Sequence, residues 1–89
     1  MARMTNEFIL NEWLKEKVFQ GTTLVASHEI QLEFPRYAKI VWGALLLPDT
    51  ASRLWRKMRE TMSYRNIGIE KVVEHKNDSK EMYWDLVKT

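Results

Sequence analysis

The segment from Pro48 to Met62, PDTASRLWRKMRETM, constrains the fold most, because it combines a helix start with two separate side-chain stripes. Proline is typical of the first helical position, and Asp49 follows it as an acceptor for the N–H groups of the first turn. One stripe is apolar and recurs at helical spacing, at about 100° per residue: Ala51, Leu54, Trp55, Met58 and Met62. We therefore expect a helix over residues 49–62 that buries this stripe and turns its other side outward.

Positive charge is concentrated in the same segment. The whole chain carries a net charge of only +2, and residues 1–45 hold five basic and five acidic side chains. Residues 50–66 hold five basic side chains against Glu60 alone, a local balance of +4: Arg53, Arg56, Lys57, Arg59 and Arg65. Arginine is well suited to bidentate contacts with phosphates and guanine edges. The pattern favours a polyanionic partner, although an ordinary solvated helix face has the same composition.

The first half of the chain predicts further helices. An apolar face at helical spacing indicates a helix from about Asn6 to Phe19, with Gly21 as its stop. Residues 22–25 are expected to form a brief strand or an extended link, because Thr and Val are β-branched. Ser27 is then the expected N-cap of a second helix that buries Ile30 and Phe34. Pro35 leaves two alternatives open, a kinked helix or a separate helix over Arg36–Leu45.

From Ile67 onward the pattern becomes that of strands. Residues 67–73 are β-prone, and their alternation breaks near Lys71, which predicts a bulge. Asn77-Asp78-Ser79 is typical of a turn, and residues 82–87 alternate as in a half-buried strand. We expect a hairpin over residues 67–87, with Lys76 and Lys80 near its tip, packed on the helices because a lone hairpin is unstable.

Several classes of site are disfavoured by composition. The absence of Cys removes disulfides, thiolate zinc sites and cysteine nucleophiles. His28 and His75 are far apart in the sequence, and no Gly-rich phosphate loop or nucleophile elbow is present. We therefore expect a non-catalytic protein with no metal and no cofactor. The length of the chain predicts one domain, residues 1–89. Residues 1–7 lack the apolar core of a secretory signal, so we expect the protein in the cytoplasm or at the nucleoid.

The order of helix, short strand, helix, basic helix and hairpin resembles the winged helix-turn-helix family across most of the chain. Residues 49–60, DTASRLWRKMRE, are similar to many recognition helices of that family. The resemblance implies an α+β fold of three helices with a C-terminal β-hairpin wing, with or without a short strand after the first helix. It further implies that helix 49–62 reads the major groove of double-stranded DNA, while the hairpin touches the backbone or minor groove. With Arg65 added from the charge pattern, the expected DNA-binding residues are Thr50, Ser52, Arg53, Arg56, Lys57, Arg65, Lys76 and Lys80.

Such a protein would be a small transcriptional regulator or an accessory factor in DNA transactions. The apolar link Trp42–Leu47 departs from the family pattern, however. An exposed apolar patch there would indicate a homodimer or a protein partner. The alternative is therefore a winged-helix protein–protein interaction module that does not bind DNA. RNA is a weaker option, because Tyr83 and Trp84 point to opposite faces of the hairpin and form no aromatic platform.

Overall fold

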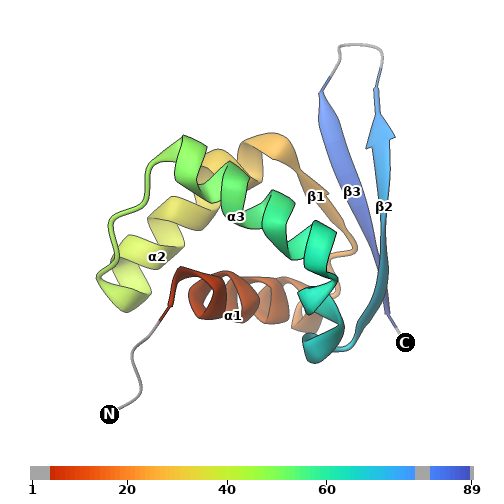
Figure 1. Cartoon of the computed structure of the whole chain (residues 1–89), viewed down its shortest axis with the longest axis horizontal. Coiled ribbons are helices and arrows are strands. Elements are labelled where there is room, and N and C mark those ends of the chain that lie inside the picture. The colour runs from red at the N-terminus through yellow and green to blue at the C-terminus, as the bar shows by residue number, and fades with distance from the viewer. Residues whose placement is uncertain (1–4, 78–80, 89) are drawn as a thin grey trace.

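The computed structural model describes residues 5–77 and 81–88. Within them the fold is α+β, with helices packed beside a 3-stranded antiparallel sheet of order β1-β3-β2. The elements are α1 (Asn6–Phe19), β1 (Leu24–Ala26), the π-helix η1 (Glu29–Glu33), α2 (Phe34–Trp42), α3 (Pro48–Thr61), the 3-10 helix η2 (Ser63–Ile67), β2 (Ile69–Lys76) and β3 (Met82–Lys88). Figure 1 shows the β2–β3 hairpin at one end of the molecule, projecting past the helices.

The first helix has the predicted bounds. Its N-terminus is capped by Thr5, whose hydroxyl accepts the N–H of Phe8 at 3.1 Å. Its C-terminus has the two bonds of a Schellman motif, from Gly21 N–H to the Val18 carbonyl and from Thr22 N–H to the Lys17 carbonyl. Gly21 makes this turn possible because its φ of 85° is in the left-handed region. The predicted stop is confirmed.

Pro35 is accommodated in a way that matches neither alternative fully. It lies at the start of α2, as in the separate-helix alternative, but α2 follows η1 without a break. The N–H of Phe34 bonds back five residues to the Glu29 carbonyl, so the π turn precedes the residue that has no N–H. The predicted cap at Ser27 is wrong, because Ser27 is itself helical. At that end Glu29 instead accepts the N–H of Ala26 at 3.2 Å.

The basic helix α3 buries Ala51, Trp55 and Met58, as predicted. Two details of the prediction are wrong. Met62 is not part of the buried stripe: it ends the helix in the left-handed conformation, with φ 57°, and is 47% exposed. Asp49 does not cap the helix, because the cap position is Leu47 and Asp49 lies exposed in the first turn.

The hairpin is shorter at its start than predicted. Ile67 belongs to η2, and Gly68, with φ 87°, turns the chain into β2 at Ile69. A register shift between Ile69 and Lys71 confirms the predicted bulge. Trp84 and Leu86 are buried, as the alternation of β3 predicted. Asp78, Ser79 and Lys80, where the turn and one tip lysine were expected, lie outside the described residues.

The core joins α3 to the sheet through aromatic contacts. The ring of Trp55 meets the ring of Trp84 edge-on, with centroids 5.5 Å apart, and Trp13 of α1 packs on Phe34 of α2. The position of α3 beside the hairpin is therefore set by large buried side chains. No helix within the described ranges is long and apolar enough to cross a membrane.

Candidate nucleic-acid interface

The outer side of α3 carries three exposed cations. Arg53, Arg56 and Lys57 are all exposed and fall opposite the buried stripe, as about 100° per residue requires. Arg53 and Arg56 form no hydrogen bond or ion pair with any residue that the structure describes. Their guanidinium groups therefore remain available to an external ligand.

Two carboxylates share this outer side of α3. Asp49 and Glu60 are exposed, and helical geometry places them between the same cations. With Arg53, Arg56 and Lys57 they leave a balance of +1 on the solvent side of the helix. The segment count of +4 overstated the field, because it excluded Asp49 and included two arginines, Arg59 and Arg65, that lie elsewhere.

Lys57 lies at the edge of α3 next to α1. Its Nζ is 3.0 Å from the Oε1 of Glu7, and both side chains are largely exposed, at 65% and 47%. An exposed pair of this kind contributes about 0–1 kcal/mol, so it is readily exchanged for another anion. The contact joins α3 to the first turn of α1.

Arg59 is the basic residue of α3 that does not face outward. Its guanidinium lies over the ring of Trp84, 4.7 Å from the centroid, and over Trp55 at 5.6 Å. It also pairs with Glu74 of β2 at 3.5 Å, and its side chain is only 27% exposed. Burial lowers the pKa of Arg59, partly offset by the charge of Glu74, but an arginine remains charged. Arg59 therefore joins α3 to the hairpin rather than contributing to the outer face.

The hairpin presents Lys76 on its helix-facing side. Lys76 pairs in register with Met82, and Glu74 pairs with the buried Trp84, so these four side chains share one face of the sheet. Lys76 is exposed and forms no ion pair with a described residue. Lys76 lies two residues after Glu74, the ion-pair partner of Arg59, which is about 7 Å along the strand at about 3.3 Å per residue. The structure thus brings Lys76 to the side of the hairpin on which α3 lies.

Three of the remaining expected site residues lie at the margins. Ser52 is half-buried, and its hydroxyl accepts the side-chain N–H of Gln31 at 3.2 Å, which turns it toward η1. Thr50 is half-buried on the first turn of α3. Arg65 lies in η2, where its Nε donates to the Glu70 carbonyl at 3.2 Å. Along β2, Glu70 is about 20 Å from Lys76 at about 3.3 Å per residue, so Arg65 lies far from Lys76.

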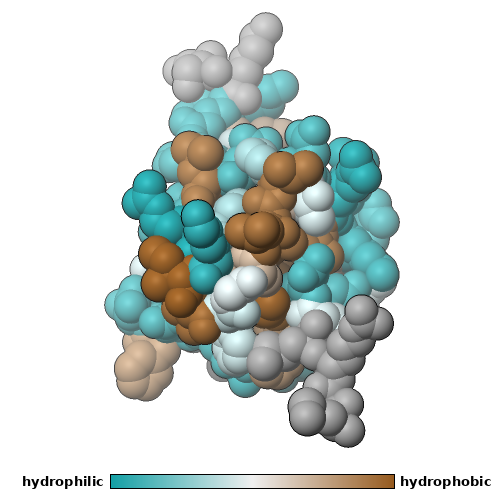
Figure 2. Space-filling view, turned by 90° about the vertical axis from the view of Figure 1, so that its left-hand side faces the viewer, coloured by the Kyte–Doolittle hydropathy of each residue, from teal (hydrophilic) through white to brown (hydrophobic). Residues whose placement is uncertain are grey.

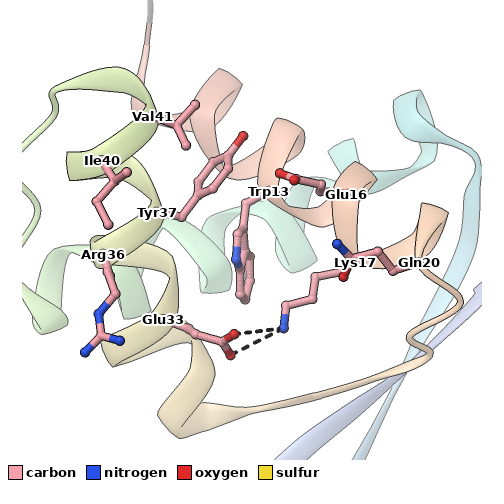
Figure 3. A pocket seen from close by; sticks show the side chains of 9 residues that line it. All are labelled: Trp13, Glu16, Lys17, Gln20, Glu33, Arg36, Tyr37, Ile40 and Val41. Carbon is pink, nitrogen blue, oxygen red and sulfur yellow. Dashed lines mark hydrogen bonds and ion pairs between the residues drawn. The ribbon is translucent and has the colours of Figure 1, made fainter.

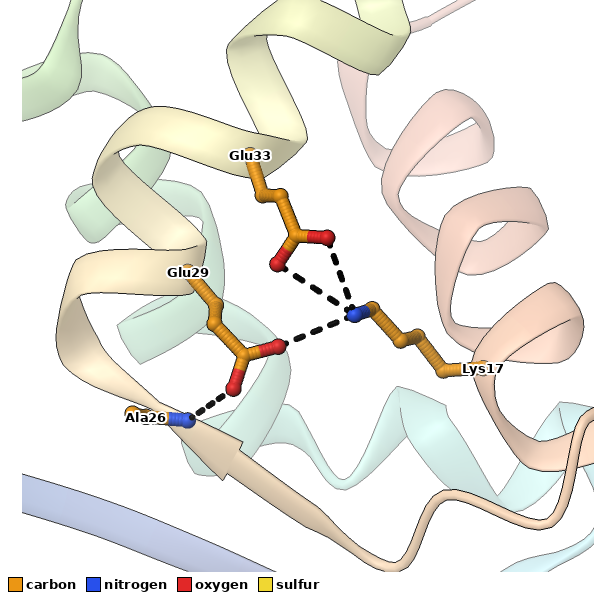
Figure 4. Close-up of polar contacts among 4 residues, drawn as sticks. All are labelled: Lys17, Ala26, Glu29 and Glu33. Carbon is orange, nitrogen blue, oxygen red and sulfur yellow. Dashed lines mark hydrogen bonds and ion pairs between the residues drawn. The ribbon is translucent and has the colours of Figure 1, made fainter.

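An ion cluster between α1 and η1 escaped sequence analysis. The Nζ of Lys17 is 2.9 Å from Glu29 and 3.3 Å from Glu33, and Glu29 also accepts the Ala26 N–H (Figure 4). Burial would lower the pKa of Lys17, but the hydrogen bonds and charges of both glutamates outweigh it and raise that pKa. Because Lys17 and Glu29 are only 16% and 20% exposed, this cluster is a structural link between two helices. The i, i+4 spacing of the two glutamates was the only signal in the sequence.

A second ion pair that the sequence did not predict joins His28, just before η1, to Glu81, just before β3. The Nδ1 of His28 contacts a carboxylate oxygen of Glu81. This hydrogen bond is the largest cause that raises the pKa of His28; desolvation opposes it, and the charges of Glu81, Glu29 and Glu33 add to it. Among the described residues, no group of three or more His, Asp or Glu side chains is arranged to hold a metal ion.

The geometry therefore offers one candidate surface for a polyanion: Arg53, Arg56 and Lys57 on α3, with Lys76 on the hairpin beside it. Comparisons of the chain with protein-family models, with curated proteins and with solved structures found no significant match.

Proposed function

We propose that this chain is a winged helix-turn-helix protein that binds duplex DNA without catalysis, as a small regulator or accessory factor. The order α1-β1-α2-α3-β2-β3 supports this assignment, because it is the order that resembles the family. The pairing of β1 with β3 adds to it by attaching the hairpin firmly to the helices. In this assignment α3 is the recognition helix and the β2–β3 hairpin is the wing.

The observation that carries the proposal is the pair Arg53 and Arg56, exposed opposite the buried Trp55. An α-helix with its side chains is about 10–12 Å across and fits the major groove, which is about 12 Å wide. The two guanidinium groups would meet guanine edges or phosphates, while Lys57 and Lys76 would meet the backbone on either side. These four cations give about four phosphate contacts. Because the carboxylates of Asp49 and Glu60 lie among them and repel the phosphates, we expect a modest affinity for DNA.

The direct test is the affinity for a mixed-sequence duplex at low salt, measured by fluorescence anisotropy. We expect Arg53→Ala/Arg56→Ala to weaken binding by at least about tenfold, because two of the four expected phosphate contacts are lost. The matched control is Lys15→Ala/Lys88→Ala, which removes the same charge from exposed positions on α1 and β3. Equal losses in the two double variants would mean that charge alone drives binding. No binding by the folded wild-type protein would refute the proposal.

A further inference from the structure

A second surface of the molecule is apolar and exposed. Ile40 of α2 is 74% exposed, and Leu45 and Leu47 of the link between α2 and α3 are 82% and 72% exposed. Apolar side chains gather on this face of the molecule in Figure 2. These residues line a groove together with Pro35, Arg36, Lys39 and Leu46, which we call the α2–link groove.

The exposure follows from the conformation of the link. Leu46 is half-buried and packs on the core, while its neighbours Leu45 and Leu47 are exposed. In an extended segment alternate side chains point to opposite sides, so burying Leu46 turns the other two outward. Gly43, with φ 65°, ends α2 and directs the chain into this segment. Large apolar side chains exposed together indicate an interaction surface.

The charged residues at the groove are all basic. Arg36 and Lys39 line it, and neither forms a hydrogen bond or ion pair with a described residue. The neighbouring hollow differs, because it contains Glu33 paired with Lys17 as well as Glu16. Figure 3 shows Arg36 pointing away from that pair and from Trp13. The α2–link groove thus combines leucine and isoleucine side chains with two unpaired cations.

We propose that the α2–link groove binds an acidic, amphipathic segment of another protein. The apolar residues of such a segment would cover Ile40, Leu45 and Leu47, and its carboxylates would meet Arg36 and Lys39. A second copy of this chain fits less well, because a two-fold contact would bring the basic side chains of both copies together without an acidic residue in the groove. A nucleic acid fits less well too, because the floor of the groove is apolar.

The proposal is independent of DNA binding, and the two surfaces are compatible. Figure 1 shows α2 and the link at the opposite end of the molecule from the hairpin. A partner in the groove would leave Arg56 and Lys76 uncovered. A chain with both activities would bring a second protein to DNA.

The test is an NMR titration of the ¹⁵N-labelled full chain with a synthetic amphipathic helix of Leu and Glu residues. We expect shifts confined to residues 35–47. Leu45→Ser/Leu47→Ser and Arg36→Glu/Lys39→Glu should each weaken binding by about tenfold or more. Phe19→Ser is the matched control, because Phe19 is 90% exposed but lies outside the groove, and it should bind the peptide unchanged.

Three results would overturn the proposal. One is equal binding of a peptide in which Lys replaces every Glu. Another is the absence of localised shifts although all variants are folded by circular dichroism. The third is a wild-type dimer in sedimentation that Leu45→Ser/Leu47→Ser dissociates, because the groove would then be occupied by a second copy. Fluorescence anisotropy with duplex DNA on the same variants separates failure of the groove from failure of DNA binding. Leu45→Ser/Leu47→Ser should lose peptide binding and retain DNA binding.

Discussion

Individual arginines of α3 differ in role although they are neighbours in sequence. Arg53 and Arg56 are exposed, whereas Arg59 covers two indole rings and pairs with Glu74. Composition treats the three alike, and helical geometry places Arg59 only at the flank of the apolar stripe. The difference arises from the hairpin, which supplies Trp84 and Glu74 from more than ten residues away in the chain. Stability and binding should therefore depend on different arginines.

Replacing Arg59 by Ala should destabilise the fold by about 1–2 kcal/mol, because the cation over Trp84 and Trp55 and the packing of its stem are both lost. Arg53→Ala is the matched variant and should change the free energy of unfolding by at most about 0.5 kcal/mol, since Arg53 is exposed. Urea unfolding followed by tryptophan fluorescence measures both. Equal stability of the two variants would show that Arg59 is not a structural contact.

His28 gives the fold a dependence on pH. Its pKa is raised above the ordinary value of 6.5 by the hydrogen bond to Glu81. A raised pKa means that protonation favours the folded state, so the contribution is fully present below pH 6.5 and is lost as pH rises through the raised pKa. We expect the difference in urea midpoint between the wild-type protein and His28→Gln to decrease as pH rises from about 5.5 to about 8. A difference that is constant over this range would contradict the assignment.

At the level of helices and strands, the sequence predicts the features that depend on local patterns and misses those that depend on tertiary contacts. The bounds of α1, the stop at Gly21 and the bulge near Lys71 follow from periodicity, capping and broken alternation, all of which are local. The π turn before Pro35 was not predicted by these local patterns. It arises because the helix continues through a proline, which has no N–H to donate. Met62 fitted the apolar period but lies beyond the helix, where the chain turns toward the sheet. The ion cluster of Lys17 likewise needs two helices to be brought together.

The end of α2 depends on the backbone of Gly43. A Cβ at this position would meet no atom within 4 Å, so the penalty of a substitution comes from its φ of 65° alone. Gly43→Ala should therefore cost about 1 kcal/mol of stability, and Gly43→Asn should cost less, because Asn tolerates the left-handed region better. Thermal or urea unfolding ranks the two variants. If Asn proves as costly as Ala, the left-handed conformation does not set the penalty.

At the scale of the whole molecule, the outer face of α3 and the α2–link groove are two separate surfaces. The outward-facing cations lie along α3, which runs from the link toward the hairpin, while the exposed leucines lie on the link itself (Figure 1). The sequence showed both segments, the basic helix and the apolar Trp42–Leu47 link, but not their exposure. Trp42 proves half-buried, with its indole N–H donating to the Tyr37 hydroxyl at 3.1 Å and its ring against Phe8. Among the large apolar side chains of the link, Leu45 and Leu47 are the strongly exposed ones.

The salt dependence of duplex binding shows whether α3 binds DNA through its exposed cations. With Arg53, Arg56, Lys57 and Lys76 as the contacts, the logarithm of the affinity should fall with the logarithm of salt concentration with a slope of about −4. In Arg53→Ala/Arg56→Ala the slope should shrink by about 2, because two phosphate contacts are lost. A wild-type slope near zero, or a slope that the double variant leaves unchanged, would mean that α3 is not the DNA-binding element.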